Sequence, residues 1–172
     1  KPNTKLRNLI ADFIYRSNEI ERYQVDYNNC LNCAELLMQG LPSKYFKTKD
    51  PHILNQCNLL KTAYFLKKFD SPYKVIHLHE AFHPKTLERG EPGEFRGYPH
   101  ASPVGNQYCS HDKLFSALRK LENIDDPFLK HIIYEWIHPF CDGNGRSGRI
   151  MLLSDLNFDF EKVLKFISEE NY

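Results

Sequence analysis

The sequence of 172 residues predicts a mainly α-helical domain. Apolar residues recur at three- and four-residue spacing along most of the chain, which is typical of amphipathic helices packed on a shared core. Seven of the eight glycines fall within two stretches, 90–105 and 143–148, so most of the remaining chain can be helical. With 41% hydrophobic residues, the chain is long enough for one packed core, and we expect a single domain over 1–172.

The expected helices can be placed in chain order. The first covers 5–22, and further helical patterns cover 29–39, 52–69, 73–82 and 112–122. The apolar face of the first helix consists of Leu6, Leu9, Ile10, Phe13, Ile14 and Ile20.

The next helix begins at Asp126 and Pro127, which form a good N-cap and first-turn pair. Its broad apolar face consists of Phe128, Leu129, Ile132, Ile133, Trp136 and Ile137, so we expect this helix to be the buried centre of the fold. Pro139 cannot continue the helix, which places His138 at its end.

The stretch 84–105 contains four prolines and four glycines, and short extended pieces such as EFRGY alternate there with turn signals. It predicts a long surface loop or a hairpin. A connection of this length without a helix is more often functional than idle.

Composition restricts the class of partner. A formal net charge of +1 gives no basic footprint for nucleic acid, and no apolar run approaches the roughly 18 residues that span a bilayer. The chain start lacks the apolar core of a signal peptide, and five cysteines are an odd number for a disulfide framework. We therefore expect a cytoplasmic protein with reduced thiols that binds neither nucleic acid nor membrane. Cys30 and Cys33 form a CxxC without a second ligand pair, so we expect two buried side chains rather than a zinc site.

Residues 138–149 read HPFCDGNGRSGR and contain a GxGxxG pattern. A dinucleotide site is not expected, because that pattern needs a preceding strand, and a helix precedes it here. A P-loop fails because Arg149 and Ile150 stand where lysine and a hydroxyl belong. A plain turn explains one glycine well, but not three glycines together with two arginines.

The segment instead predicts a phosphate cradle. Gly143, Asn144 and Gly145 allow successive backbone N–H groups to point at one anion, and the helix that begins near Arg146 adds its N-terminal partial charge. Arg146 and Arg149 lie three residues apart and can each bind a phosphate, which favours a di- or triphosphate.

Two further residues complete the expected chemistry. Asp142 precedes the anion site and would repel a phosphate unless Mg²⁺ lay between them. His138 is the nearby group able to accept a proton at neutral pH. Together, these residues predict nucleotide-dependent transfer to a hydroxyl.

The same segment matches the Fic family signature HxFx[DE]GNGRxxR at every specified position, and PGEFR (92–96) resembles a recurrent Fic segment. The resemblance covers about residues 5 to 156 and implies a Fic-like helical bundle with a β-hairpin flap. It implies a protein adenylyltransferase, in which His138 deprotonates a target hydroxyl, Asp142 holds Mg²⁺, and the glycine-rich loop binds ATP. AMP then passes to the target as pyrophosphate leaves, and Phe140 anchors the loop in the core.

Other Fic-type reactions stay open. Relatives of Doc type, which transfer a phosphoryl group, usually depart from the GNGR that is kept at 143–146, so AMP transfer is favoured. The loop does not exclude another nucleotide donor or the removal of AMP. The target side chain can be serine, threonine or tyrosine, and the oligomeric state stays open.

The first helix carries RSNEIER, in which Ser17 and Glu21 share a face. An isolated S-x-x-x-E would be an ordinary solvated face. In a Fic-like chain it resembles the inhibitory motif [ST]xxxE[GN], which implies an inhibitory helix over 5–24 and a pairing of Glu21 with Arg149. Arg22 departs from the glycine or asparagine that the motif expects next.

The resemblance also implies a target-docking flap before the signature, within GYPHASPVGNQY (97–108). The residues expected at its tip are Ser102, Pro103, Val104, Gly105 and Asn106. Pairing through the main chain carries little sequence information, so the target protein is not specified.

A zinc metallopeptidase is the remote alternative, because HEAFH (79–83) fits HExxH through His79, Glu80 and His83. Pro84 disfavours helical geometry at the second histidine, and no convincing third ligand follows. We therefore expect these histidines to be packing or surface residues.

Overall fold

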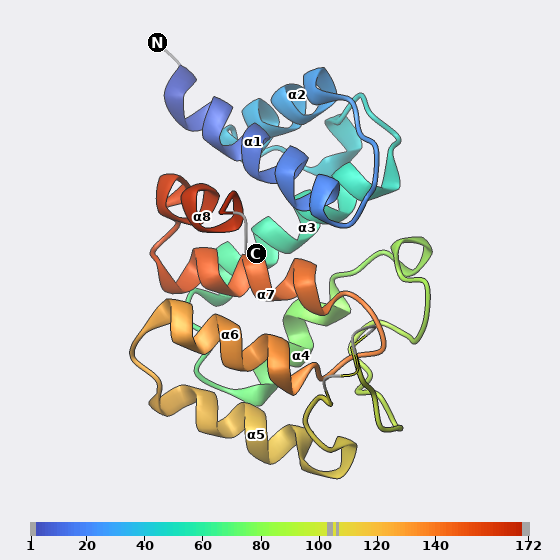
Figure 1. The fold of residues 1–172 in the computed structure, drawn as a ribbon. Coiled ribbons are helices and arrows are strands. Elements are labelled where there is room, and N and C mark those ends of the chain that lie inside the picture. The colour runs from blue at the N-terminus through green and yellow to red at the C-terminus, as the bar shows by residue number, and fades with distance from the viewer. Residues whose placement is uncertain (1–2, 103–104, 106, 170–172) are drawn as a thin grey trace.

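The described part of the chain folds into eight α-helices joined by short turns and one long loop (Figure 1). The computed structural model describes residues 3–102, 105 and 107–169. The helices are α1 (Thr4–Ile20), α2 (Tyr27–Met38), α3 (Pro51–Leu66), α4 (Pro72–Glu80), α5 (Leu114–Lys120), α6 (Pro127–Ile137), α7 (Asn144–Asp155) and α8 (Phe160–Ile167). The prediction of a mainly α-helical fold is confirmed, and α8 is a helix that the sequence did not assign.

Local signals explain where the helices begin. The side chain of Asp126 accepts hydrogen bonds from the backbone N–H groups of Phe128 (2.9 Å) and Leu129 (3.3 Å) at the start of α6. Asp50 and Ser71 cap α3 and α4 in the same way, and each of these three helices has a proline in its first turn.

The centre of the fold is α7, which packs against α3, α6 and α8 (Figure 1). Its residues Ile150, Met151, Leu152 and Leu153 follow one another in sequence and are all buried. Helix α7 begins in the glycine-rich segment at Asn144. The packing around α7 therefore fixes the position of that segment.

The expectation that the helix at 127–137 is the buried centre is wrong. In α6, Leu129, Ile132 and Trp136 are 48%, 57% and 52% exposed, respectively. The inward face of α6 is instead formed by Lys130, His131, Tyr134 and Ile137.

The polar ends of these inward-facing side chains have partners inside the fold. Lys130 Nζ donates to the carbonyl oxygen of Phe69 (3.0 Å) and to Asp155 (3.2 Å), and the Tyr134 hydroxyl lies 2.8 Å from Ser147 Oγ. A long polar side chain can bury its apolar stem when its polar tip has a hydrogen-bond partner. The prediction counted only apolar residues, and it therefore assigned the wrong face of α6 to the core.

The predicted hairpin at 97–108 is not confirmed, because no sheet is found among the described residues. An isolated antiparallel bridge joins Ala101 to Gln107, and the backbone N–H of Tyr108 donates to the carbonyl of His100 (3.1 Å). These contacts place the two arms of the loop side by side. Pro103, Val104 and Asn106 lie outside the described residues, so the tip of the expected flap is not described.

Cys30 and Cys33 lie buried on one side of α2, as expected, and both are free thiols. No group of three or more His, Cys, Asp or Glu side chains arranged to hold a metal ion occurs within the described ranges. None of the described helices combines the length and apolar character needed to cross a membrane.

Candidate active site

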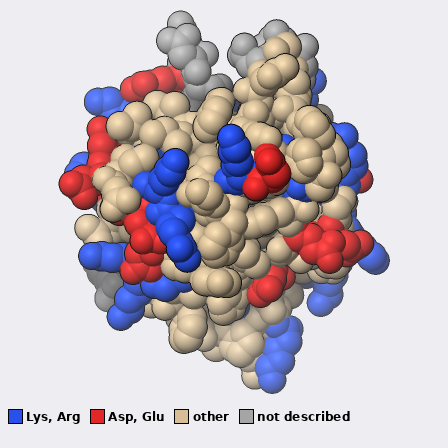
Figure 2. Space-filling view, turned by 90° about the horizontal axis from the view of Figure 1, so that it is seen from below, with Lys and Arg blue, Asp and Glu red and all other residues tan. Residues whose placement is uncertain are grey.

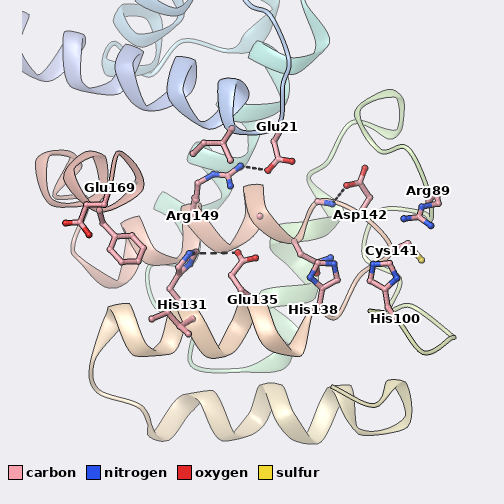
Figure 3. Close-up of a pocket in the computed structure, with 16 residues that line it drawn as sticks. Glu21, Arg89, His100, His131, Glu135, His138, Cys141, Asp142, Arg149 and Glu169 are labelled. Atoms are coloured by element: carbon pink, nitrogen blue, oxygen red, sulfur yellow. Dashed lines mark hydrogen bonds and ion pairs between the residues drawn. The ribbon is translucent and has the colours of Figure 1, made fainter. Parts of the chain in front are cut away.

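A cleft of about 640 Å³ lies beside the first turn of α7, between the end of α1, α6 and the end of α8 (Figure 3). Its lining includes Glu21, Glu135, His138, Asp142, Gly145 and Arg149. The predicted base, acidic residue and second arginine therefore line one cavity.

His138 is the C-cap of α6 and adopts a left-handed backbone conformation, with φ 49° and ψ 60°. Its imidazole stacks on the Tyr108 ring, with ring centroids 4.0 Å apart and an interplanar angle of 1°. Burial lowers the pKa of His138 to about 4, and the neighbouring His100 adds to this shift. The imidazole is therefore neutral near pH 7 and able to accept a proton.

The loop after His138 is fixed by Phe140 and Asn144. Phe140 is fully buried, and its ring stacks on His79 at 3.7 Å. The Asn144 side chain accepts a hydrogen bond from the Phe140 N–H (3.0 Å) and donates one to the Phe140 carbonyl (2.9 Å). Phe140 lies where an anchor was expected, whereas the Asn144 amide holds the loop together.

The absence of a side chain at Gly143 and Gly145 lets neighbouring side chains pack directly against the loop backbone. Gly143 has φ 82°, and a Cβ there would lie 2.9 Å from the Phe82 ring. At Gly145, a Cβ would lie 2.8 Å from Glu21 Oε1. The first N–H groups of α7 have no partner within the helix, and a helix N-terminus carries a partial positive charge, so this end of α7 is suited to an anion.

Asp142 lies on the wall of this cleft, and its side chain is 24% exposed. Its carboxylate accepts hydrogen bonds from the N–H groups of Gly143 (2.7 Å) and Glu88 (2.8 Å). One carboxylate beside a helix N-terminus is compatible with Mg²⁺, which usually combines one or two carboxylates with substrate phosphates.

Arg146, predicted to grip a phosphate, is not among the residues that line the cleft. It is 1% exposed and donates to the carbonyl of Thr86 at 2.7 Å. Its Nη2 lies 3.3 Å from Asp142 Oδ2. The structure therefore places Arg146 behind the acidic residue, which it orients.

Glu21 and Arg149 form an ion pair across the cleft, with 2.5 Å between Oε1 and Nη2 (Figure 3). Ser17 Oγ accepts hydrogen bonds from Arg149 Nε (3.0 Å) and from Gln56 (3.1 Å). The predicted inhibitory residues thus meet the second arginine, and their carboxylate lies directly against Gly145.

The HExxH segment does not form a zinc site in this structure. Helix α4 ends at Glu80, so His83 lies beyond the helical turn that the motif needs. His79 is buried, and its Nδ1 accepts a hydrogen bond from the Gly93 N–H (2.8 Å). Its Nε2 therefore carries the proton and donates to the carbonyl of Asp142 (2.9 Å). Both ring nitrogens are used, and His79 joins the PGEFR segment to the loop.

Sequence reasoning missed two residues that face the site. Tyr108 stacks on the proposed base, and Glu135 lies in the cleft near Arg149. Burial raises the pKa of Glu135 to about 7, an effect that Arg149 opposes. The position of Glu135, one helical turn before His138, is the signal that could have found it.

This arrangement defines a helical Fic domain. The chain belongs to the Fic/DOC family, whose sequence profile matches residues 68–154. Fic domains generally transfer nucleotidyl or phosphoryl groups to proteins.

Solved structures show the same fold. A Fic family protein from Desulfovibrio desulfuricans G20 matches with a TM-score of 0.65 and 18% identity, over 95% of this chain and 52% of that one. A Fic domain containing signaling protein from Bacteroides thetaiotaomicron VPI-5482 matches with a TM-score of 0.64 and 20% identity, over 96% of this chain and 71% of that one. The chain thus spans about half the length of the first of these proteins. No curated protein matches the sequence.

Proposed function

We propose that this protein transfers AMP from ATP to a serine, threonine or tyrosine hydroxyl of a target protein. The observation that carries the proposal is a neutral histidine beside the N-terminus of a buried helix, in one cleft. The histidine can accept a proton, and the helix end can bind phosphates.

In the proposed reaction, the target hydroxyl gives its proton to His138 as its oxygen attacks the α-phosphorus of ATP. A new P–O bond forms, the bond between the α-phosphorus and the oxygen bridging to the β-phosphate breaks, and pyrophosphate leaves. The first N–H groups of α7 stabilise the negative charge on the phosphates.

Asp142 would hold Mg²⁺, which neutralises phosphate charge when bound. The two backbone N–H groups and the Arg146 guanidinium that contact Asp142 hold its carboxylate in place on the cleft wall. Arg146 thus acts through Asp142, whereas Arg149 lines the cleft and is the phosphate-binding arginine.

The intact GNGR segment favours AMP transfer over phosphoryl transfer, as in the family resemblance. Transfer of another nucleotide and removal of AMP would use the same cleft.

We also propose that Glu21 inhibits the enzyme. Its carboxylate neutralises Arg149 and lies where a Cβ on Gly145 would be only 2.8 Å away. A phosphate approaching the N–H groups at Gly145 would meet a negative charge in its way. Inhibition would therefore disturb how the phosphates are seated, while the rest of the cleft stays accessible.

The target would approach from the loop arms that flank His138. Tyr108 stacks on His138, and the Ala101–Gln107 bridge lies close by in the loop, so an extended target segment could place its hydroxyl beside the imidazole. Acidic and basic side chains are interspersed on the face seen in Figure 2, which offers no basic footprint for nucleic acid there.

Mass spectrometry of cell extract incubated with ATP, Mg²⁺ and the Glu21→Gly variant tests the proposal. We expect target peptides that carry the mass of one AMP, and no such peptides when His138→Ala is added to the same chain. Peptides that gain only a phosphate would support Doc-type transfer instead. No gain in mass on any protein would contradict the proposed function.

A further inference from the structure

Arg96, the last residue of the PGEFR segment, is buried in the wall behind His138 and is only 1% exposed. Its guanidinium donates hydrogen bonds to four backbone carbonyls. Nε bonds to His138 (2.6 Å), Nη1 to Tyr98 (2.9 Å), and Nη2 to Ile137 (3.1 Å) and Cys109. These acceptors come from the end of α6 and from both arms of the loop before α5.

The charge of Arg96 is balanced by backbone dipoles. Among the described residues, its contacts include no ion pair with an aspartate or glutamate. The carbonyls of Ile137 and His138 belong to the C-terminal end of α6, which carries a partial negative charge. Burying a cation costs free energy unless its donors are satisfied. The reason for a guanidinium at this place is therefore best sought in the backbone segments whose carbonyls it binds.

The backbone of His138 needs such support, because its φ of 49° is uncommon for a residue with a side chain. The Arg96 guanidinium donates to the carbonyl of His138 itself. The backbone N–H of Arg96 donates to the next carbonyl, that of Pro139 (2.9 Å). The left-handed turn that directs the imidazole into the cleft is therefore held through consecutive carbonyls.

The same guanidinium fixes the ring that lies on the imidazole. Tyr108 directly precedes Cys109, whose carbonyl accepts from Arg96 and whose N–H donates to the carbonyl of Trp136 (3.1 Å). Tyr98, on the opposite arm, is bound by the other terminal nitrogen of Arg96. Arg96 thus ties the backbone of His138 to the two arms that bring Tyr108 against the His138 ring.

We propose that Arg96 is a positioning residue, which holds His138 in its left-handed turn and keeps Tyr108 stacked on the imidazole. The proposal rests on the proposed function in that His138 is taken as the base. Displacing a reacting group by about 1 Å is enough to lower a rate by about 100-fold. Because Arg96 does not line the cleft, its loss spares the phosphate-binding groups.

The test is Arg96→Lys, made in the Glu21→Gly background. Lysine keeps the charge, but one ammonium group cannot replace a planar fork that reaches four carbonyls. Arg119→Lys, on the exposed surface of α5, is the matched control. Arg96→Gln provides a second variant with no charge to bury, in case the lysine variant does not fold.

Two readouts are needed. The first is kcat and the KM for ATP, measured as transfer of AMP. The second is the ¹³C–¹H NMR signal of the His138 ring in histidine-labelled protein without nucleotide, assigned by its loss in His138→Ala. Ring stacking on Tyr108 is expected to shift this signal upfield.

We expect Arg96→Lys to lower kcat by about 100-fold with an unchanged KM for ATP and to move the His138 signal toward that of a free imidazole. The control Arg119→Lys should change neither kcat nor the His138 signal. An unmoved His138 signal would overturn the proposal, as would equal losses of ATP binding and transfer. If the parent protein transfers no AMP, the proposed function fails, and the NMR signal alone decides the role of Arg96.

Discussion

Replacing Glu21 should release the enzyme, and the structure gives the size of the effect. The Glu21 carboxylate lies 2.5 Å from Arg149 Nη2, and the two side chains are 27% and 2% exposed, respectively. A hydrogen bond to a charged group contributes about 1.5 to 3 kcal/mol. Since about 1.4 kcal/mol corresponds to a tenfold change in an equilibrium, Glu21→Gly should raise the rate of AMP transfer by about 10- to 100-fold.

The substitution is well placed for a clean comparison. Glu21 is the C-cap of α1, with φ −81°, so glycine there does not interrupt the helix. Ser17 still accepts from Arg149 Nε after the change, which keeps the arginine near its present position. Glu19→Gln is the matched control, because Glu19 lies on the same helix and pairs with Arg16 at the surface.

The assay is incorporation of labelled AMP into the protein itself and into a target, together with ATP affinity measured by calorimetry. We expect faster transfer in Glu21→Gly, no change in Glu19→Gln, and a smaller gain in Glu21→Gln, which loses the charge but keeps its bulk over Gly145. Arg149→Ala should not activate, and the double variant should behave like Arg149→Ala. Equal rates in Glu21→Gly and the parent protein would refute the reasoning.

Three further outcomes are expected. His138→Ala should lower AMP transfer by about 10²- to 10⁴-fold while ATP binding persists in calorimetry, and unchanged labelling would exclude His138 as the base. Asp142→Asn should raise the Mg²⁺ concentration needed for half-maximal activity, because an amide is a weaker ligand for a hard cation, and an identical Mg²⁺ titration would argue against a metal role. Burial lowers the pKa of His131 to about 4 in the folded protein, below the ordinary value of about 6.5. Between these two pH values the unfolded chain protonates His131 and the folded protein does not, so the free energy of unfolding decreases as the pH falls through that window. Urea unfolding should show this decrease in the free energy of unfolding as about 3 kcal/mol. The decrease should be smaller in His131→Asn, whose side chain can still donate to the Gly148 carbonyl, and an equal decrease in both proteins would contradict this.

The loop at 138–149 could be predicted because its geometry depends on local sequence. Pro139 ends α6, the glycines permit the turn, and the signature specifies His138, Phe140, Asp142, Asn144 and the two arginines. The contact between Glu21 and Arg149 was expected from the family resemblance, and the distance between them follows from how α1 packs.

Tertiary packing decided what the sequence did not reveal. The inward face of α6 was misassigned because Lys130 and His131 satisfy their polar atoms on distant segments, which periodicity cannot show. The contact of Arg146 with the carbonyl of Thr86, sixty residues earlier in the chain, is likewise invisible in the sequence pattern. Helix α8 follows left-handed residues at Asn157 and Phe158, which the composition of that turn does not suggest.

The most direct test of the central claim is to compare ATP labelled at the α-phosphate with ATP labelled at the γ-phosphate, using the Glu21→Gly variant and a target-containing extract. Transfer of AMP predicts that protein retains the α-label and not the γ-label, and that adding His138→Ala abolishes this retention. Retention of the γ-label on protein, or of neither label, would contradict the proposal that this Fic domain is an adenylyltransferase.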